Sequence, residues 1–94
     1  MAVEIIATGR AVPPRRVTND ELATRLDTSD EWIRSHTGIG NRHIADDATA
    51  TSDLAHEAAR AALSDIAERE NISVEEAALS LDLIVVATAS PDYF

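Results

Sequence analysis

Residues Leu83–Ala87 read LIVVA, an apolar run that no polar residue interrupts. A continuous run of this kind is typical of a strand whose two faces are both covered, as in the centre of a parallel sheet. Because parallel strands are joined by helical crossovers, the run favours an α/β fold.

A second principal strand is predicted close to the N-terminus. Residues Val3–Gly9 read VEIIATG and combine β-branched residues with a terminal glycine. A loop around Pro13 and Pro14 is expected to follow it. Residues 39–45 are expected to form a brief strand or an extended connection.

Three capping boxes, in which a Ser or Thr opens a helix and a Glu follows three residues later, predict helix starts. They are Thr18 with Glu21, Thr28 with Glu31, and Ser73 with Glu76. The first of these helices is expected to reach about Leu26, and the third is expected to reach Leu79. The second is expected to stop at Gly38 in a left-handed turn. A longer helix is expected from Asp53 to about Arg69, where apolar residues recur every four positions.

This set of elements looks like an incomplete fold. Two principal strands and one long helix cannot cover both faces of a central strand, so the run at 83–87 would keep an apolar face or edge unprotected. Residues 1–94 are therefore expected to be part of a larger α/β domain.

Composition and charge exclude several classes of function. The net charge is −9, from 17 acidic residues and 8 arginines, and no basic stripe is present, so nucleic acid is not an expected partner. The chain has no cysteine, which excludes disulfides, zinc thiolates and a thiol nucleophile within it. No signal peptide or apolar run of membrane-spanning length is present, so a cytoplasmic protein with no membrane partner is expected.

Several familiar site motifs are missing as well. No glycine-rich phosphate loop occurs, and the pair His56-Glu57 is followed by Arg60 where a zinc-binding helix would need its second histidine. We therefore expect no metal site. His43 lies in a short extended segment and is interpreted as structural. No nucleophile has a base beside it.

Residues 28–39, TSDEWIRSHTGI, contain the only tryptophan of the chain. In a helix that starts at Ser29, Trp32 and His36 share a face, and Thr28 lies at the end of the same row. Spacing alone leaves two interpretations open. In one, Thr28 caps the helix, Trp32 anchors it to the body of the protein and His36 lies at the surface. In the other, Trp32 stacks on an adenine and a phosphate lies near His36.

The segment VTNDELATRLDTSDEWIRSHTGIGNRHIA closely resembles the N-terminal region of ketoacyl-acyl-carrier-protein synthase III. This family comprises the condensing enzymes that start type II fatty-acid synthesis. The opening IIATGRAVP and the closing LDLIVVATASPDYF look like the same family. The resemblance thus covers essentially the whole chain in order.

The resemblance implies a thiolase-like fold, in which two similar halves stack in five αβαβα layers and the enzyme is a homodimer. Residues 1–94 would be part of the first half, without the region of the catalytic cysteine and without the second half. In that family an acyl-CoA, commonly acetyl-CoA, acylates the cysteine and the acyl group condenses with malonyl-acyl-carrier protein. Coenzyme A thioester is then a substrate, acyl-carrier protein a partner, and no cofactor is permanently bound.

The same resemblance assigns binding roles but no catalytic residue to this chain. The family's cysteine, histidine and asparagine would all lie beyond Phe94, so the chain alone is expected to be inactive. Trp32 would stack on the adenine of coenzyme A, with Thr28 close enough to hydrogen-bond it. Tyr93 and Phe94 would approach the acyl pocket and the dimer interface.

Position 36 departs from the family, which commonly has an arginine that meets the phosphates of the nucleotide. An imidazole is mostly neutral at pH 7, whereas a guanidinium is always charged. His36 therefore predicts weaker coenzyme A binding that improves as the pH falls towards 6.

Two alternatives to this synthase stay open from sequence. One is a non-catalytic binding or interaction module derived from the same fold, and the other is a related polyketide or secondary-metabolite synthase. A reading frame that continues past Phe94 to a cysteine codon would favour an enzyme over the module.

Overall fold

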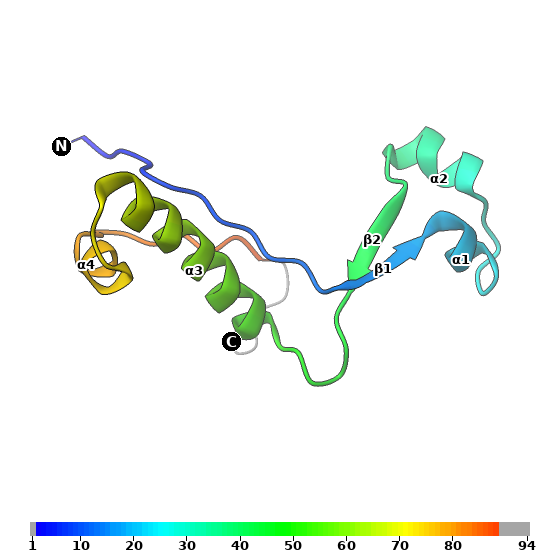
Figure 1. Cartoon of the computed structure of the whole chain (residues 1–94). Helices are drawn as coiled ribbons and strands as arrows, with labels where there is room; N and C mark the ends of the chain where they lie inside the picture. Colours follow the sequence, from blue (N-terminus) through cyan, green and yellow to red (C-terminus); the bar gives the residue numbers. More distant parts are fainter. Residues whose placement is uncertain (1, 89–94) are drawn as a thin grey trace. The chain divides into compact units, whose positions relative to one another are not determined.

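The computed structural model describes residues 2–88, which divide into two compact units. One unit is Val12–Ala48, and the other combines the described residues that precede it with those that follow it. The elements in chain order are β1 (Arg15–Thr18), α1 (Asn19–Ala23), α2 (Asp30–Thr37), β2 (Asn41–Ile44), α3 (Thr51–Glu70) and α4 (Val74–Leu79) (Figure 1).

The unit Val12–Ala48 is built on the antiparallel pair β1 and β2. Arg15 lies opposite Ile44 at one end of the pair, and Thr18 lies opposite Asn41 at the other. Strand β2 confirms the extended segment predicted at residues 39–45. Strand β1 falls directly after Pro14, where a loop had been expected, because β2 supplies the hydrogen-bonding partner that a local reading cannot show.

Helix α1 starts where its capping pattern predicts but is shorter than expected. The hydroxyl of Thr18 accepts a hydrogen bond from the backbone N–H of Glu21 at 3.2 Å. The carboxylate of Glu21 accepts from Arg15 Nη2 at 2.9 Å, so its charge faces a guanidinium on β1. The helix ends at Ala23 rather than near Leu26.

The buried side chain of Asn19 connects three segments of this unit. Asn19 is 1% exposed, and its Nδ2 donates to Asp30 Oδ1 at 2.9 Å and to the carbonyl of Ile39 at 2.7 Å. Its Oδ1 accepts from Arg42 Nη2 at 2.7 Å. The backbone N–H of Asn19 donates to the carbonyl of Gly40 at 3.2 Å. The start of α1, the start of α2 and the entry to β2 are thereby tied together.

The pKa of the Asp30 carboxyl group lies below its ordinary value because this group accepts two side-chain hydrogen bonds. The hydrogen bond from Asn19, and then the one from Arg34 Nε at 2.8 Å, lower the pKa of Asp30 from its ordinary 3.8. A lowered pKa means that the ionised form is favoured in the folded state. The contribution of Asp30 to stability is therefore present above pH 3.8 and is lost as the pH falls through the folded pKa.

The second unit contains the long helix α3, which confirms the helix predicted over residues 53–69. Ala50 offers no side-chain acceptor at the N-cap, but Asp53 Oδ2 accepts from the Ala50 N–H at 2.8 Å. The helix ends at Asn71, whose backbone is left-handed with φ 54°. Asparagine is one of the few residues besides glycine that adopts this conformation readily.

Helix α4 forms with the complete capping box that the sequence predicts. Ser73 Oγ accepts from the Glu76 N–H at 3.0 Å, and Glu76 Oε1 accepts from the Ser73 N–H at 3.4 Å. Helix α4 packs on α3, and the buried apolar side chains of this unit are Ile66 and Ala77, among the residues that the structure describes.

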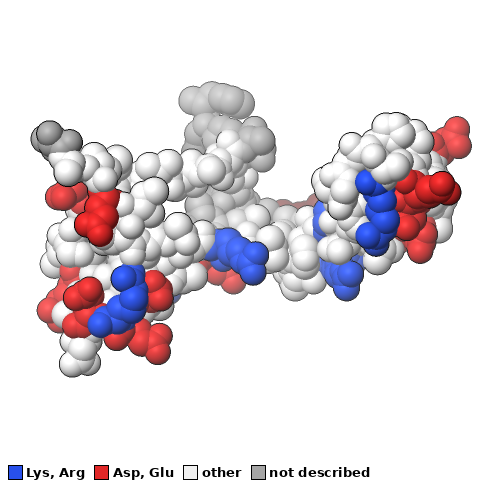
Figure 2. Space-filling model, turned by 90° about the horizontal axis from the view of Figure 1, so that it is seen from above, with Lys and Arg blue, Asp and Glu red and all other residues white. Residues whose placement is uncertain are grey.

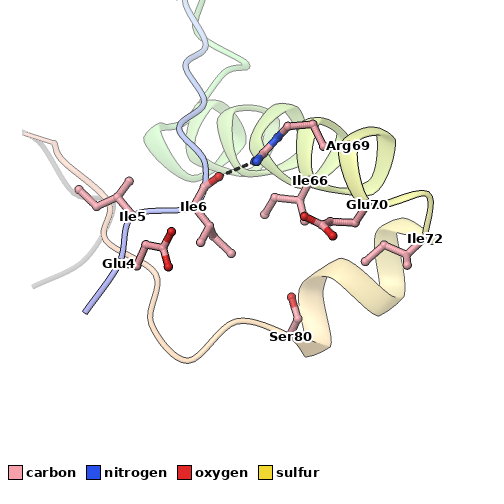
Figure 3. A pocket seen from close by; sticks show the side chains of 8 residues that line it. All are labelled: Glu4, Ile5, Ile6, Ile66, Arg69, Glu70, Ile72 and Ser80. Carbon is pink, nitrogen blue, oxygen red and sulfur yellow. Dashed lines mark hydrogen bonds between the residues drawn. The ribbon is translucent and has the colours of Figure 1, made fainter. Parts of the chain in front are cut away.

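The N-terminal segment runs along α3 in an extended conformation (Figure 1). A Cβ atom at Gly9 would lie 2.0 Å from the carbonyl oxygen of Ala58, so only glycine allows this approach. Nearer the N-terminus, Arg69 Nη2 donates to the carbonyl of Ile6 (Figure 3). These two contacts hold the segment to the helix.

Neither Val3–Gly9 nor Leu83–Ala87 forms the strand that was predicted. Ile5 is 83% exposed and Val85 is 81% exposed. A strand requires a neighbour for its backbone hydrogen bonds, and no strand of residues 2–88 pairs with either segment. The parallel sheet is consequently missing from the described residues, and the apolar run at 83–87 is unprotected, as expected of an incomplete fold. Tyr93 and Phe94 lie outside the described residues.

Replacing Asn19 by aspartate should destabilise the unit Val12–Ala48 by about 2 to 3 kcal/mol. The variant loses both bonds that Nδ2 donates and places a carboxylate against Asp30 and the Ile39 carbonyl. Urea unfolding of the chain, followed by the fluorescence of its single tryptophan, measures the change. Asn41→Asp, the same substitution on β2, is the control and should cost less than about 1 kcal/mol. Equal losses for the two variants would contradict the role assigned to Asn19.

Candidate functional site

Helix α2 carries two of the three predicted site residues, Trp32 and His36, and Ser29 rather than Thr28 is its N-cap. Ser29 is extended, with φ −145° and ψ 159°, and its hydroxyl accepts from the Trp32 N–H at 3.1 Å. The prediction that Thr28 caps the helix is therefore wrong. Both residues are good caps, and the adjacent serine is the one whose hydroxyl reaches the N–H three residues later.

Because Ser29 is the N-cap, the hydroxyl of Thr28 does not make the capping hydrogen bond that was predicted for it. Thr28 Oγ1 is buried and has no hydrogen-bond partner among the described residues. A buried hydroxyl without a partner costs about 1 to 3 kcal/mol. A hydroxyl can both donate and accept a hydrogen bond, so Thr28 stays a candidate ligand contact.

The indole of Trp32 lies on the outside of the unit. Its side chain is 55% exposed, although tryptophan is usually well buried. This exposure argues against the interpretation in which Trp32 anchors α2 to the body of the protein. It agrees with the interpretation in which the indole offers a flat apolar surface to a ligand.

His36 stacks directly on Trp32. The two ring centroids are 4.0 Å apart and the ring planes differ by 18°. His36 Nδ1 lies 2.8 Å from the backbone carbonyl of Trp32, which can only accept, so Nδ1 carries the hydrogen. Nε2 is then the atom that a neutral imidazole offers as an acceptor. Ser35 Oγ donates to the same carbonyl at 3.0 Å and lies 3.2 Å from His36 Nδ1.

Gly38 ends the helix just beyond the stacked pair, as predicted. Its φ is 74°, which favours glycine, and its N–H donates to the carbonyl of Arg34 at 2.8 Å. The structure thus brings Trp32 and His36 together on one short, well-capped helix. Thr28 lies just before the N-cap of that helix.

The contact between the two rings is the feature that sequence reasoning missed. Their spacing placed Trp32 and His36 on one face, but a phosphate rather than the indole was expected beside His36. The signal was available, because helical side chains point back towards the preceding turn and residues four apart meet there.

Among residues 2–88, the other polar side chains form no comparable site. His43 Nδ1 donates to the carbonyl of Pro13 at 2.7 Å, which agrees with its interpretation as a structural histidine. Within residues 2–88 there is no group of three or more His, Cys, Asp and Glu side chains placed to hold a metal ion. None of the helices described there is long and apolar enough to cross a membrane.

A shallow hollow lies beside α3 and α4 in the other unit (Figure 3). Four isoleucines line it, namely Ile5, Ile6, Ile66 and Ile72. Its one cationic group, Arg69, is paired with Asp65 and bonded to the Ile6 carbonyl. Elsewhere on the surface, acidic side chains and arginines intermix on the face that Figure 2 draws.

The sequence closely matches one group of curated proteins. It is 53% identical over 89 residues to a β-ketoacyl-[acyl-carrier-protein] synthase III of Neisseria gonorrhoeae. It is 49% identical over 88 residues to one of Wolbachia pipientis, and 48% identical over 92 residues to one of Rickettsia bellii. These alignments cover 94 to 98% of this chain and 25 to 26% of the relatives. No family model matches the chain.

Solved structures agree with the sequence matches. The 3-oxoacyl-[acyl-carrier-protein] synthase III of Aquifex aeolicus superposes with a TM-score of 0.63 and 39% identity, over 80% of this chain and 23% of that one. The corresponding enzyme of Pseudomonas aeruginosa gives 0.58 and 49%, over 63% of this chain and 18% of that one. The predicted partial α/β, thiolase-like fold is confirmed. Over nearly its whole length, the chain therefore matches the N-terminal quarter of β-ketoacyl-[acyl-carrier-protein] synthase III proteins.

Proposed function

We propose that this chain is the N-terminal part of a 3-oxoacyl-[acyl-carrier-protein] synthase III that condenses acetyl-CoA, or another acyl-CoA, with malonyl-acyl-carrier protein. The support is an identity of about half over nearly the whole chain with synthases of that name. The same relatives favour a synthase over a non-catalytic module. In this proposal the complete protein is a cytoplasmic homodimeric acyltransferase.

The catalytic groups of this proposed enzyme lie outside residues 1–94, which form part of its first half-domain. The chain has no cysteine that an acyl group could occupy, and two of its three histidines are engaged by other groups of the chain. His43 is bonded to a backbone carbonyl and His36 is stacked on Trp32. We therefore expect the isolated chain to bind a substrate without turning it over.

The contribution of this chain is a binding surface for the adenine end of coenzyme A. The observation that carries this proposal is the exposed indole of Trp32, stacked on His36 on one face of α2. An adenine is a flat aromatic ring that stacks well on an indole. The buried hydroxyl of Thr28, which has no partner in the described residues, supplies a hydrogen bond to the edge of the base.

His36 gives this surface a contact for phosphate that depends on protonation. Its Nδ1 is engaged with the Trp32 carbonyl, so only Nε2 is available to a ligand. A neutral imidazole presents a lone pair there, which a phosphate oxygen avoids. A protonated imidazole presents an N–H, which the phosphate oxygen accepts.

Trp32→Ala should raise the dissociation constant for coenzyme A by about 5- to 150-fold, because base stacking contributes about 1 to 3 kcal/mol. Isothermal titration of the chain with coenzyme A measures this change. Trp32→Phe keeps an aromatic surface and should recover part of the affinity. Leu79→Ala, which removes another exposed apolar side chain on α4, is the control and should change nothing. An unchanged constant in Trp32→Ala would refute the adenine surface.

His36→Arg should tighten coenzyme A binding at pH 8 and remove its dependence on pH. In the unsubstituted chain the affinity should rise as the pH falls from 8 to 6, because imidazoles gain a proton in this range. An arginine is charged throughout and binds phosphate through two donors. His56→Arg makes the same change at an exposed position of α3 and should leave the pH profile as it is. A flat profile in the unsubstituted chain, with no tightening in His36→Arg, would contradict the phosphate contact.

A further inference from the structure

We infer that His36 is a positioning residue for Trp32: the imidazole supports one face of the indole, so that the opposite face is the one presented to the adenine. This inference rests on the proposed coenzyme A site. It assigns His36 a second contribution that needs no phosphate and no protonation.

The stacked geometry determines which face of Trp32 a ligand can use. With centroids 4.0 Å apart and planes within 18°, the imidazole occupies the stacking distance on one side of the indole. An aromatic ligand cannot enter that space without removing His36. Trp32 is nevertheless 55% exposed, so we expect the opposite face of the indole to be open to the adenine. The expected order of rings is adenine, indole, imidazole.

Hydrogen bonds hold the imidazole in this place. His36 Nδ1 donates to the carbonyl of Trp32 at 2.8 Å, which ties the ring to the backbone one turn earlier on the same helix. Ser35 Oγ lies 3.2 Å from the same nitrogen and also donates to that carbonyl. Turning the imidazole away from the indole would break its hydrogen bond to the backbone as well as the stack.

The stack with His36 should lower the conformational entropy that the Trp32 side chain loses when a ligand binds. An exposed tryptophan on a helix samples several side-chain rotamers, and a ligand that needs one of them must pay for the lost freedom. A ring already packed against the indole restricts that freedom before the ligand arrives. The effect acts on the adenine, so it should be equal for adenosine and for coenzyme A. A contact between His36 and phosphate would act on coenzyme A alone.

The first part of the test uses no ligand. Trp32 is the only tryptophan of the chain, so the near-ultraviolet circular dichroism of indole and its quenching by acrylamide report on this residue alone. His36→Ala should weaken the dichroism band and increase quenching, because the indole loses its support on one face. His36→Phe keeps a ring there and should retain both signals. His56→Ala is the control, and far-ultraviolet dichroism should be the same in all variants.

The second part measures binding of adenosine and of coenzyme A by the same variants at pH 8. His36→Ala should weaken both ligands by the same factor, about two- to tenfold for one lost aromatic pair. His36→Phe should restore adenosine binding. If His36→Ala weakened coenzyme A alone and phenylalanine gave no rescue, His36 would be a phosphate ligand and the inference would be overturned.

The two parts separate this inference from the function on which it rests. If His36→Ala changed the signals of Trp32 as expected but no variant bound either ligand, the coenzyme A site would be wrong while the support of Trp32 by His36 would stand. If the chain bound coenzyme A through Trp32 and His36→Ala left the dichroism and the quenching unchanged, the site would stand and the positioning role would be wrong.

Discussion

The amide group of Asn19 is the constraint on which the unit Val12–Ala48 depends. One buried side chain donates to Asp30 at the start of α2 and to the Ile39 carbonyl before β2, and it accepts from Arg42 within β2. An amide suits this position because it offers donors and an acceptor together without carrying a charge. The helix that carries Trp32 is therefore held at its first residue, Asp30, and just after its C-cap, at Ile39, by contacts to the same side chain.

The geometry of the candidate site depends on how α2 begins and ends. Ser29 caps the helix, which places the Trp32 N–H on its hydroxyl and leaves Thr28 with a buried oxygen that has no partner among residues 2–88. One turn after Trp32, His36 folds back onto the indole. Gly38 then ends the helix in a left-handed turn. The eight residues of α2 thus hold the exposed indole of Trp32 with His36 stacked on it, and Thr28 lies just before the N-cap of the helix.

Features that depend on local sequence could be predicted, and those that depend on distant partners could not. The capping box of Ser73 and Glu76, the long helix α3 and the glycine turn at Gly38 were predicted correctly because a few neighbouring residues determine each. The strands at residues 3–9 and 83–87 were not found, because a strand exists only with a hydrogen-bonded neighbour. Strand β1 was missed for the same reason.

In the candidate site, too, some features of single residues could be predicted from the sequence and others could not. Helical spacing was enough to place Trp32 and His36 on one face. The ligand of Thr28 and Trp32 rests on the family resemblance and stays a prediction. Spacing could not decide between two adjacent capping residues, Thr28 and Ser29, which have similar preferences. It also could not give the rotamer of His36, on which the stack with Trp32 depends.

In the proposed function, α2 presents a surface for the adenine end of coenzyme A. The most direct measurement is a titration of the ¹⁵N-labelled chain with coenzyme A, followed by two-dimensional NMR. If α2 presents this surface, the largest shifts should come from the indole N–H of Trp32 and from the backbone amides of Thr28 and His36. Shifts centred on the hollow beside α3 and α4, or no shifts at all, would contradict it.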